Sequence, residues 1–98
     1  MSMPDTLPPT LSGAARMLRD AYPGGMPDTA YFAVLALLYD HFSDRNLTEL
    51  MAAVTGKDAA VVLNDIYACA SSEPAPSAIA AARKLLARHG LQAVCAED

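Results

Sequence analysis

The chain contains no tryptophan and few other aromatic residues, which favours helices over strands, and it has only two cysteines and few basic residues. Seven Lys and Arg residues stand against eleven Asp and Glu residues, which gives a formal net charge of −4. A protein that binds nucleic acid without sequence preference needs a dense cationic surface to displace counterions from phosphates, and this composition does not provide one. Anionic membrane surfaces are disfavoured for the same reason. We therefore expect no nucleic-acid partner and no membrane partner.

Long hydrophobic runs and an export signal are also missing. Residues 1–11 show no basic segment followed by an apolar one, as a secretory signal peptide would. The longest apolar run, residues 30–39, is too short to cross a bilayer. Because two cysteines without an export signal fit a reducing compartment, we expect a cytoplasmic protein.

What the chain does have is apolar, alanine-rich sequence: 53% of its residues are hydrophobic, and alanine is the commonest residue. Alanine loses no side-chain entropy in a helix and packs poorly on a sheet. At 98 residues the chain has the size of one domain with one modest core. These features predict an all-α fold, a compact bundle of about five short helices with no sheet.

Apolar spacing and the positions of proline and glycine divide the chain into three parts. They are an N-terminal arm over residues 1–9, a single helical domain over residues 10–91 and a C-terminal tail over residues 92–98. Helices are predicted over residues 10–21, 28–42 and 76–89, with two more between Ser43 and Gly56 and between Asp58 and the loop at 71–77. Ser43 has a side chain suited to cap the third helix, and Thr55 or Asp58 is suited to cap the fourth.

The most distinctive stretch is the turn over residues 22–27 and the helix that follows it. Pro23 disfavours helical backbone at the residue before it and so ends the first helix. The glycine pair after it can reverse the chain at positive φ, and Asp28 or Thr29 can cap the second helix. Residues 28–42 are apolar on almost every side, so this helix is expected at the centre of the domain.

The other helices each show one apolar face at helical spacing, which predicts the side chains that enter the core. These are Leu11, Ala15, Leu18 and Tyr22 in the first, Leu47, Leu50, Met51 and Val54 in the third, Ala59, Val62, Leu63, Ile66, Tyr67 and Ala70 in the fourth, and Ile79, Ala82, Leu85 and Leu86 in the fifth. Charged residues such as Asp20, Asp40 and Asp65 are expected on the solvent faces.

A helix that ends in Ala-Tyr-Pro, a glycine-bearing turn, and then Met-Pro-x-x-x-Tyr-x-x-x-Leu-Ala-Leu-Leu resembles a small actinobacterial, mycobacterial-type family of all-helical domains of unknown function. The residues that carry the resemblance are Tyr22, Pro23, Gly25, Met26, Pro27, Tyr31, Leu35, Ala36, Leu37 and Leu38. It extends over about residues 11–94, and the Tyr-Pro-x-Gly-x-Pro turn is its most distinctive part. The resemblance implies an all-α bundle of four or five helices in a cytosolic protein. It implies no activity, so it assigns no functional residue.

Histidine, serine and carboxylates crowd together in one place, at residues 40–44. A nucleophile and its base must lie within about 3 Å of each other. Asp40 and His41 are consecutive, and consecutive residues point about 100° apart on a helix. Ser43 is better suited to cap the next helix. We therefore predict no catalytic residues and expect that the protein is not an enzyme.

Four residues are candidate zinc ligands: His41, Cys69, His89 and Cys95. They are isolated from one another, whereas structural zinc sites use closely spaced pairs. A disulfide between Cys69 and Cys95 is the alternative in an oxidising setting. The glycine pair in the turn lacks the Lys-Ser/Thr ending that a phosphate-binding loop requires. We therefore predict no metal and no cofactor.

A helix-turn-helix around Gly56 is one alternative function, that of a DNA-binding regulator. Residues 44–67 carry two basic and four acidic side chains, a net charge of −2, and DNA repels an acidic recognition helix. Arg83, Lys84 and Arg88 form a local basic cluster. It suits an acidic partner, or the negative end of a helix dipole.

The surplus of apolar residues on the helix over 28–42 points to contact rather than to chemistry. Side chains that the other helices fail to cover would form a contact surface. The residues predicted for it are Tyr22, Met26, Tyr31, Phe32 and Tyr39. The function that the sequence favours is thus a non-catalytic module for protein interaction or self-association, with an unknown protein or a second copy as partner. A small-ligand-binding domain with a pocket between the first, second and last helices is the further alternative, and full burial of the second helix is the competing interpretation.

Overall fold

A computed structural model describes residues 9–92, which form five α-helices and no strand. The helices are α1 (Pro9–Ala21), α2 (Asp28–Leu38), α3 (Asp44–Thr55), α4 (Ala59–Ser71) and α5 (Pro76–Ala87). The prediction of an all-α fold is confirmed. The predicted arm and tail lie outside the described residues, apart from Pro9, where α1 begins, and Gln92. Within residues 9–92, none of the helices combines the length and the apolarity needed to cross a bilayer.

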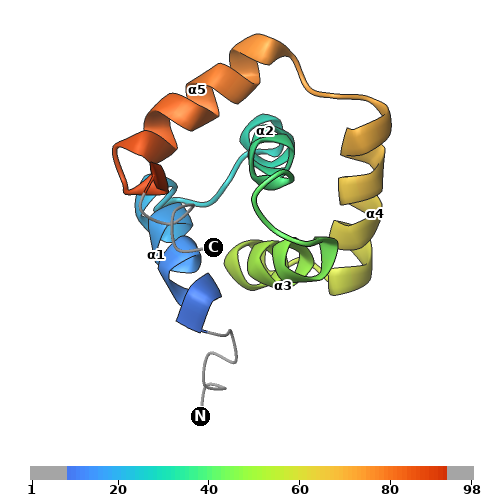
Figure 1. The fold of residues 1–98 in the computed structure, drawn as a ribbon, viewed down its shortest axis with the longest axis horizontal. Helices are drawn as coiled ribbons and strands as arrows, with labels where there is room; N and C mark the ends of the chain where they lie inside the picture. The colour runs from blue at the N-terminus through green and yellow to red at the C-terminus, as the bar shows by residue number, and fades with distance from the viewer. Residues whose placement is uncertain (1–8, 93–98) are drawn as a thin grey trace.

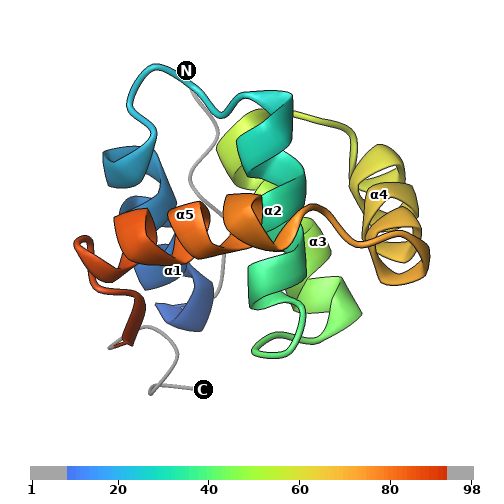
Figure 2. The ribbon, with the colours of Figure 1, turned by 90° about the horizontal axis from the view of Figure 1, so that it is seen from above.

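The second helix, α2, lies at the centre of the domain, as its apolar sequence predicts. Figure 1 shows it roughly end-on with the other four helices around it, and Figure 2 shows α5 running across it. α2 packs against α5 and α4, α3 packs against α4 and α1, and α5 also touches α1. The buried residues of α2 are Tyr31, Ala33, Val34, Leu35, Leu37 and Leu38. One short helix therefore supplies the middle of the core.

The apolar faces of α1 and α3 enter the core as their spacing predicts. The fully buried residues of these faces are Leu11, Ala15 and Leu18 in α1 and Leu47, Leu50 and Met51 in α3. They form one continuous hydrophobic cluster with the buried side chains of α2. Tyr22 and Val54, which were expected in the core, are only partly buried at its edge.

The predicted end of the second helix at Phe42 is wrong, because α2 ends at Leu38. The Leu38 carbonyl accepts hydrogen bonds from the N–H groups of both His41 (2.9 Å) and Phe42 (3.2 Å), which closes a turn. The chain has to leave the helical path here because Ser43, with extended backbone, is the N-cap of α3. The Ser43 Oγ accepts a hydrogen bond of 3.1 Å from the Asn46 N–H, so the predicted N-cap is confirmed. Phe42 still reaches the core from this turn.

The other predicted helix starts have mixed outcomes. Asp58 caps α4, since its Oδ1 accepts a hydrogen bond of 3.1 Å from the N–H two residues later. The prediction that Asp28 or Thr29 caps α2 is wrong, because the N-cap position is Pro27 and no side chain caps it. Asp28 is instead the first helical residue, where its charge complements the positive end of the helix dipole. In the preceding turn only the second glycine, Gly25, has positive φ, at 100°.

The predicted apolar face of α4 is only partly correct. Val62 and Ile66 are buried together with Cys69, and this narrow stripe faces α2 and α3. The predicted core residues that fall outside the stripe are Ala59, Tyr67 and Ala70, which are exposed, and Leu63, which is half-buried. α4 is therefore covered along one side and leaves apolar side chains in solvent on the other.

The last helix, α5, ends at Ala87, two residues before the predicted end at His89. Its final backbone hydrogen bonds run over three residues, from the Arg88 N–H to the Leu85 carbonyl and from the His89 N–H to the Leu86 carbonyl, so the last turn is tighter than an α-helix. Ala82 and Leu86 are buried as predicted, whereas Ile79 and Leu85 are only partly buried.

Two valines of different burial test the central role of α2. Val34 of α2 is fully buried and Val61 of α4 is 48% exposed. We expect Val34→Ala to lower the free energy of unfolding by about 2 kcal/mol, because it removes buried methyl groups. The same deletion in Val61→Ala should change it by less than about 0.5 kcal/mol. Urea denaturation of both variants measures the difference, and equal losses would contradict this assignment of the core.

Candidate functional site

The five residues predicted to form a contact surface do not lie on one exposed face. Tyr31 is 1% exposed and belongs to the core. Tyr22, Met26 and Phe32 are partly buried and pack against the core, and Tyr39, which follows α2, is 40% exposed. The competing interpretation, in which the rest of the domain covers this helix, therefore describes most of α2.

Tyr31 instead joins α2 to α4. Its hydroxyl donates a hydrogen bond of 2.8 Å to Asp65 Oδ2, and Lys57 Nζ lies 4.8 Å from the centroid of its ring. The Phe32 ring packs edge-on against it, with 5.0 Å between the centroids. Burial, and then the hydrogen bond to the Asp65 carboxylate, raise the pKa of Tyr31 above its ordinary value. Asp65, which was expected on the solvent face, is thereby drawn inward and half-buried.

The carboxylates, histidine and serine at residues 40–44 are not joined as a catalytic group. Ser43 Oγ caps α3, and His41 is exposed. In the described part of the chain, no hydrogen bond links His41 to Ser43 or to Asp44. Among residues 9–92, His, Cys, Asp and Glu side chains form no group of three that can hold a metal ion. Cys95, a candidate ligand, lies outside the described residues.

Cys69 is a buried thiol on the covered side of α4. It is 6% exposed, and its Sγ donates a hydrogen bond of 3.3 Å to the Phe32 carbonyl. Burial raises the pKa of the Cys69 thiol, and the carboxylates of Asp65 and Glu73 raise it further. A thiol that stays protonated is a weak nucleophile, so this cysteine acts in packing. The alternative of a disulfide with Cys95 involves a residue outside the described part.

The two helices of the proposed helix-turn-helix, α3 and α4, do pack together around Gly56. Gly56 has left-handed backbone with φ of 77°, as its position at a helix end predicts. However, α4 carries one charged residue, Asp65, and Lys57 just before it lies over the Tyr31 ring. This hairpin therefore offers DNA no basic recognition helix.

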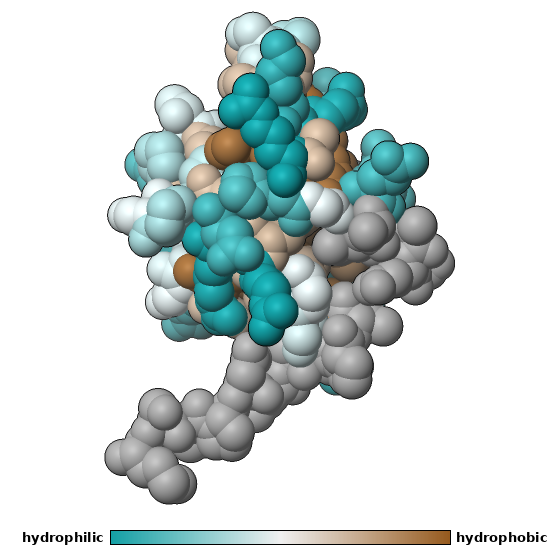
Figure 3. Space-filling model, turned by 90° about the vertical axis from the view of Figure 1, so that its left-hand side faces the viewer, coloured by the Kyte–Doolittle hydropathy of each residue, from teal (hydrophilic) through white to brown (hydrophobic). Residues whose placement is uncertain are grey.

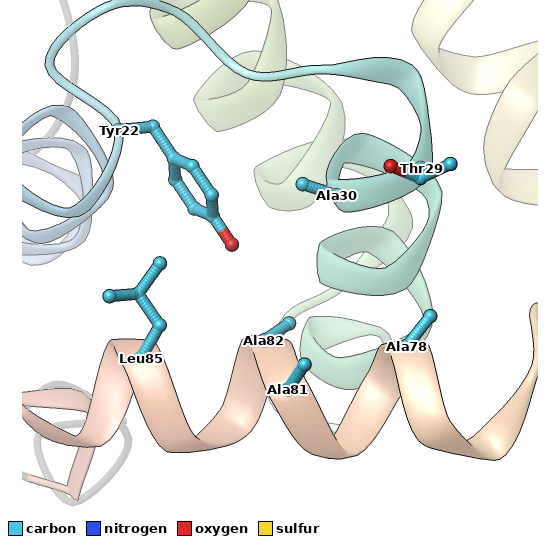
Figure 4. A pocket seen from close by; sticks show the side chains of 7 residues that line it. All are labelled: Tyr22, Thr29, Ala30, Ala78, Ala81, Ala82 and Leu85. Atoms are coloured by element: carbon cyan, nitrogen blue, oxygen red, sulfur yellow. The ribbon is translucent and has the colours of Figure 1, made fainter.

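A hollow of about 270 Å³ lies between the turn after α1, the start of α2 and α5. Figure 4 shows the Tyr22 side chain pointing from this turn toward α5, with Leu85 below it and Ala30 and Ala82 to one side. The lining residues are uncharged, and only Tyr22 and Thr29 bring hydroxyl groups. The Tyr22 phenol is protonated at physiological pH, and burial raises its pKa further. The hollow therefore suits a small apolar group and offers no acid–base chemistry.

The apolar surplus that the sequence assigns to α2 lies on α4. The exposed residues Ala60, Val61, Asn64, Tyr67, Ala68 and Ser71 form one face, which we name the α4 outer face. Val61 and Tyr67 are 48% and 52% exposed, the highest values among the large hydrophobic side chains of the described residues. A surface helix ordinarily carries charges on its outer side, and this face carries none. The signal was present in the sequence, since α4 has a single charged residue.

A groove runs beside this face, between α3 and α4. This α3–α4 groove, of about 430 Å³, is lined by Asp44, Arg45, Thr48 and Glu49 of α3 and by Ala59, Leu63 and Tyr67 of α4. Spacings of four residues place these side chains in rows along the two helices. At the edge, Arg45 Nε donates to Glu49 Oε1 over 3.4 Å, a weak and exposed ion pair. Tyr67 belongs to both the groove and the α4 outer face.

These features define a small all-α domain with one uncharged, exposed helix face. Residues 10–94 match the family described as "Protein of unknown function (DUF3349)", and the chain belongs to that family. The match covers nearly the same residues as the resemblance seen in the sequence, while the actinobacterial origin and the cytoplasmic location stay predictions. Comparison with curated proteins and comparison with solved structures give no match. The function therefore has to be inferred from the surface of the domain.

The Tyr31–Asp65 hydrogen bond has a testable dependence on pH. The pKa of Tyr31 is higher in the folded state than its unfolded value of about 10. The stabilisation that the protonated Tyr31 hydroxyl provides is therefore complete below a pH of about 10 and is lost as the pH rises further. We expect Tyr31→Phe to lower the free energy of unfolding by about 1–2 kcal/mol near neutral pH. The difference in the free energy of unfolding between Tyr31→Phe and the wild type should shrink at higher pH.

Urea denaturation at neutral pH and above the ordinary tyrosine pKa measures both effects. Tyr39→Phe is the matched control, because Tyr39 is exposed, and it should leave the stability unchanged. A Tyr31→Phe deficit that grows with pH would contradict the raised pKa of Tyr31.

Proposed function

We propose that this domain is a non-catalytic protein-interaction module whose contact surface is the α4 outer face together with the α3–α4 groove. The observation that supports this most is an exposed helix without exposed charge. The only charged side chain of α4, Asp65, is held by Tyr31, and the outward side consists of Ala, Val, Asn, Tyr and Ser. It extends over about three turns of helix. Contiguous exposed apolar surface on a small domain marks contact with another protein.

The composition of this surface fits a binding interface. Tyr67 offers an aromatic ring with a polar tip, the kind of residue that contributes most to binding when a partner buries it. Beside it, Leu63 and Ala59 give the groove an apolar floor, while Asp44 and Glu49 lie along the α3 side. An apolar centre with a polar rim is the usual anatomy of such interfaces.

The two alternatives have less support. A DNA-binding regulator would need basic side chains on α4, which has none. A small-ligand-binding domain has the hollow near Tyr22, at the predicted place. However, its lining offers no charged side chain and only two hydroxyl groups to orient a ligand.

Site-specific photo-crosslinking in the native host tests the proposed contact surface. A photoreactive phenylalanine analogue placed at Tyr67 should give covalent protein adducts, because the partner covers this ring. The matched control is the same analogue at Tyr39, a tyrosine of similar exposure outside both the α4 outer face and the groove. Equal adduct yields at the two positions, or none at Tyr67, would contradict the proposal.

A further inference from the structure

Charge is divided between two parts of the domain. Residues 39–75, which include α3 and α4, carry six acidic and two basic side chains, a net charge of −4. Residues 76–92, which include α5, carry three basic side chains and no acidic one. Figure 3 views the side that α1 and α5 form in Figure 1, and hydrophilic side chains gather over it. The domain therefore has an acidic part and a basic part.

The basic part carries a helix face shaped for close contact. The exposed residues Ser77, Ala80, Ala81, Lys84, Ala87 and Arg88 lie opposite the buried Ala82 and Leu86, and we name them the α5 outer face. Lys84 and Arg88 are one turn apart at its C-terminal end. The rest of this face is small, which lets another backbone approach closely. It thus presents two cations beside a flat strip of alanine.

The α3–α4 groove has the complementary properties. Asp44 and Glu49 lie among its lining residues, and Asp58 precedes its first α4 residue. Arg45 is the one basic lining residue, and with its weak ion pair to Glu49 the two acidic and one basic lining side chains leave a net charge of −1. The apolar lining of Leu63 and Tyr67 is open to contact by small side chains. An acidic edge around an apolar floor matches a basic helix with an alanine strip.

The two surfaces are of comparable length. The groove extends over nine residues of α4, from Ala59 to Tyr67, about 12 Å, and the α5 outer face extends over twelve residues, from Ser77 to Arg88, about 17 Å. In Figure 1, α5 and α3 lie on opposite sides of the central helix α2, so α5 cannot reach the groove of its own domain. Contact between the two surfaces has to be made between two copies.

We propose that the partner of the α3–α4 groove is a second copy of this chain, which inserts its α5 outer face. This inference rests on the proposed function, because it takes the groove to be the contact surface. The contact is head-to-tail: each copy offers its groove to one neighbour and its α5 outer face to another. Such an interface leads to open chains or closed rings rather than to a two-fold dimer. Since opposite charges guide it, salt weakens it.

Two charge-reversal variants separate the halves of this interface. Glu49→Lys alters the groove and keeps the α5 outer face, and Lys84→Glu does the reverse. Sedimentation velocity over micromolar to millimolar concentration should show association of the wild type that weakens by at least about tenfold in either variant. An equimolar mixture of the two variants should form a heterodimer, because one intact groove meets one intact α5 outer face. Glu73→Lys and Arg16→Glu, outside both surfaces, are matched controls that should associate like the wild type.

Four outcomes would overturn the inference. They are a wild type that stays monomeric at every concentration, variants that associate unchanged, a mixture that forms no heterodimer, and association that is insensitive to salt. Circular dichroism confirms that each variant is folded, and Tyr67→Ser serves as a second groove variant that should also weaken association.

The proposed function and this inference fail in different ways. If the crosslinker at Tyr67 captures another protein while the purified chain stays monomeric, the proposed function stands and the second copy is excluded as the partner. If Lys84→Glu instead abolishes binding to duplex DNA by a monomeric chain, a nucleic acid occupies the α5 outer face and the inference is wrong. Self-association that the crosslinker at Tyr67 does not capture would contradict both.

Discussion

The rest of the structure depends on covering α2, a helix that is apolar on nearly every side. The other four helices surround it, and α5 and α4 pack directly on it. Each of the five helices has only eleven to thirteen residues. In so small a domain, helices that cover a central helix have no further layer to cover their own outer sides. Most of these helices have charged residues on the uncovered outer side, so its exposure to water costs nothing. On α4 the uncovered side is apolar and remains in water.

The Tyr31–Asp65 hydrogen bond connects the core to this surface. It satisfies a buried hydroxyl, which would otherwise be costly, and it fixes α4 against α2. It also draws the one carboxylate of α4 away from the solvent side. The same bond therefore stabilises the fold and leaves the α4 outer face without charge. Exposed apolar surface promotes unspecific association, and a specific partner that covers the surface prevents it.

Much of the fold could be predicted, because it follows from local rules. The central position of α2, the caps at Ser43 and Asp58, and the glycine at the end of α3 depend only on spacing and on nearby backbone groups. The predicted end and cap of α2 failed at local turns, whereas the predicted burial of α4 failed because it depends on partners that are distant in sequence. The end of α2 depends on where α3 has to begin. Tyr67 is exposed because only a narrow side of α4 faces α2 and α3. The sequence therefore predicts the contact surface on α2, the most apolar helix, whereas we propose it on α4, whose one charged side chain is half-buried.

The central claim is that two surfaces on different sides of one domain, the α3–α4 groove and the α5 outer face, recognise each other between copies. A dilution series of two-dimensional amide spectra tests it most directly, because it reports every described helix at once. The account predicts that the signals of Leu63, Tyr67, Lys84 and Arg88 shift together as the concentration rises, while those of the buried residues of α2 stay in place. A spectrum that is constant from micromolar to millimolar concentration, or shifts confined to only one of the two surfaces, would contradict it.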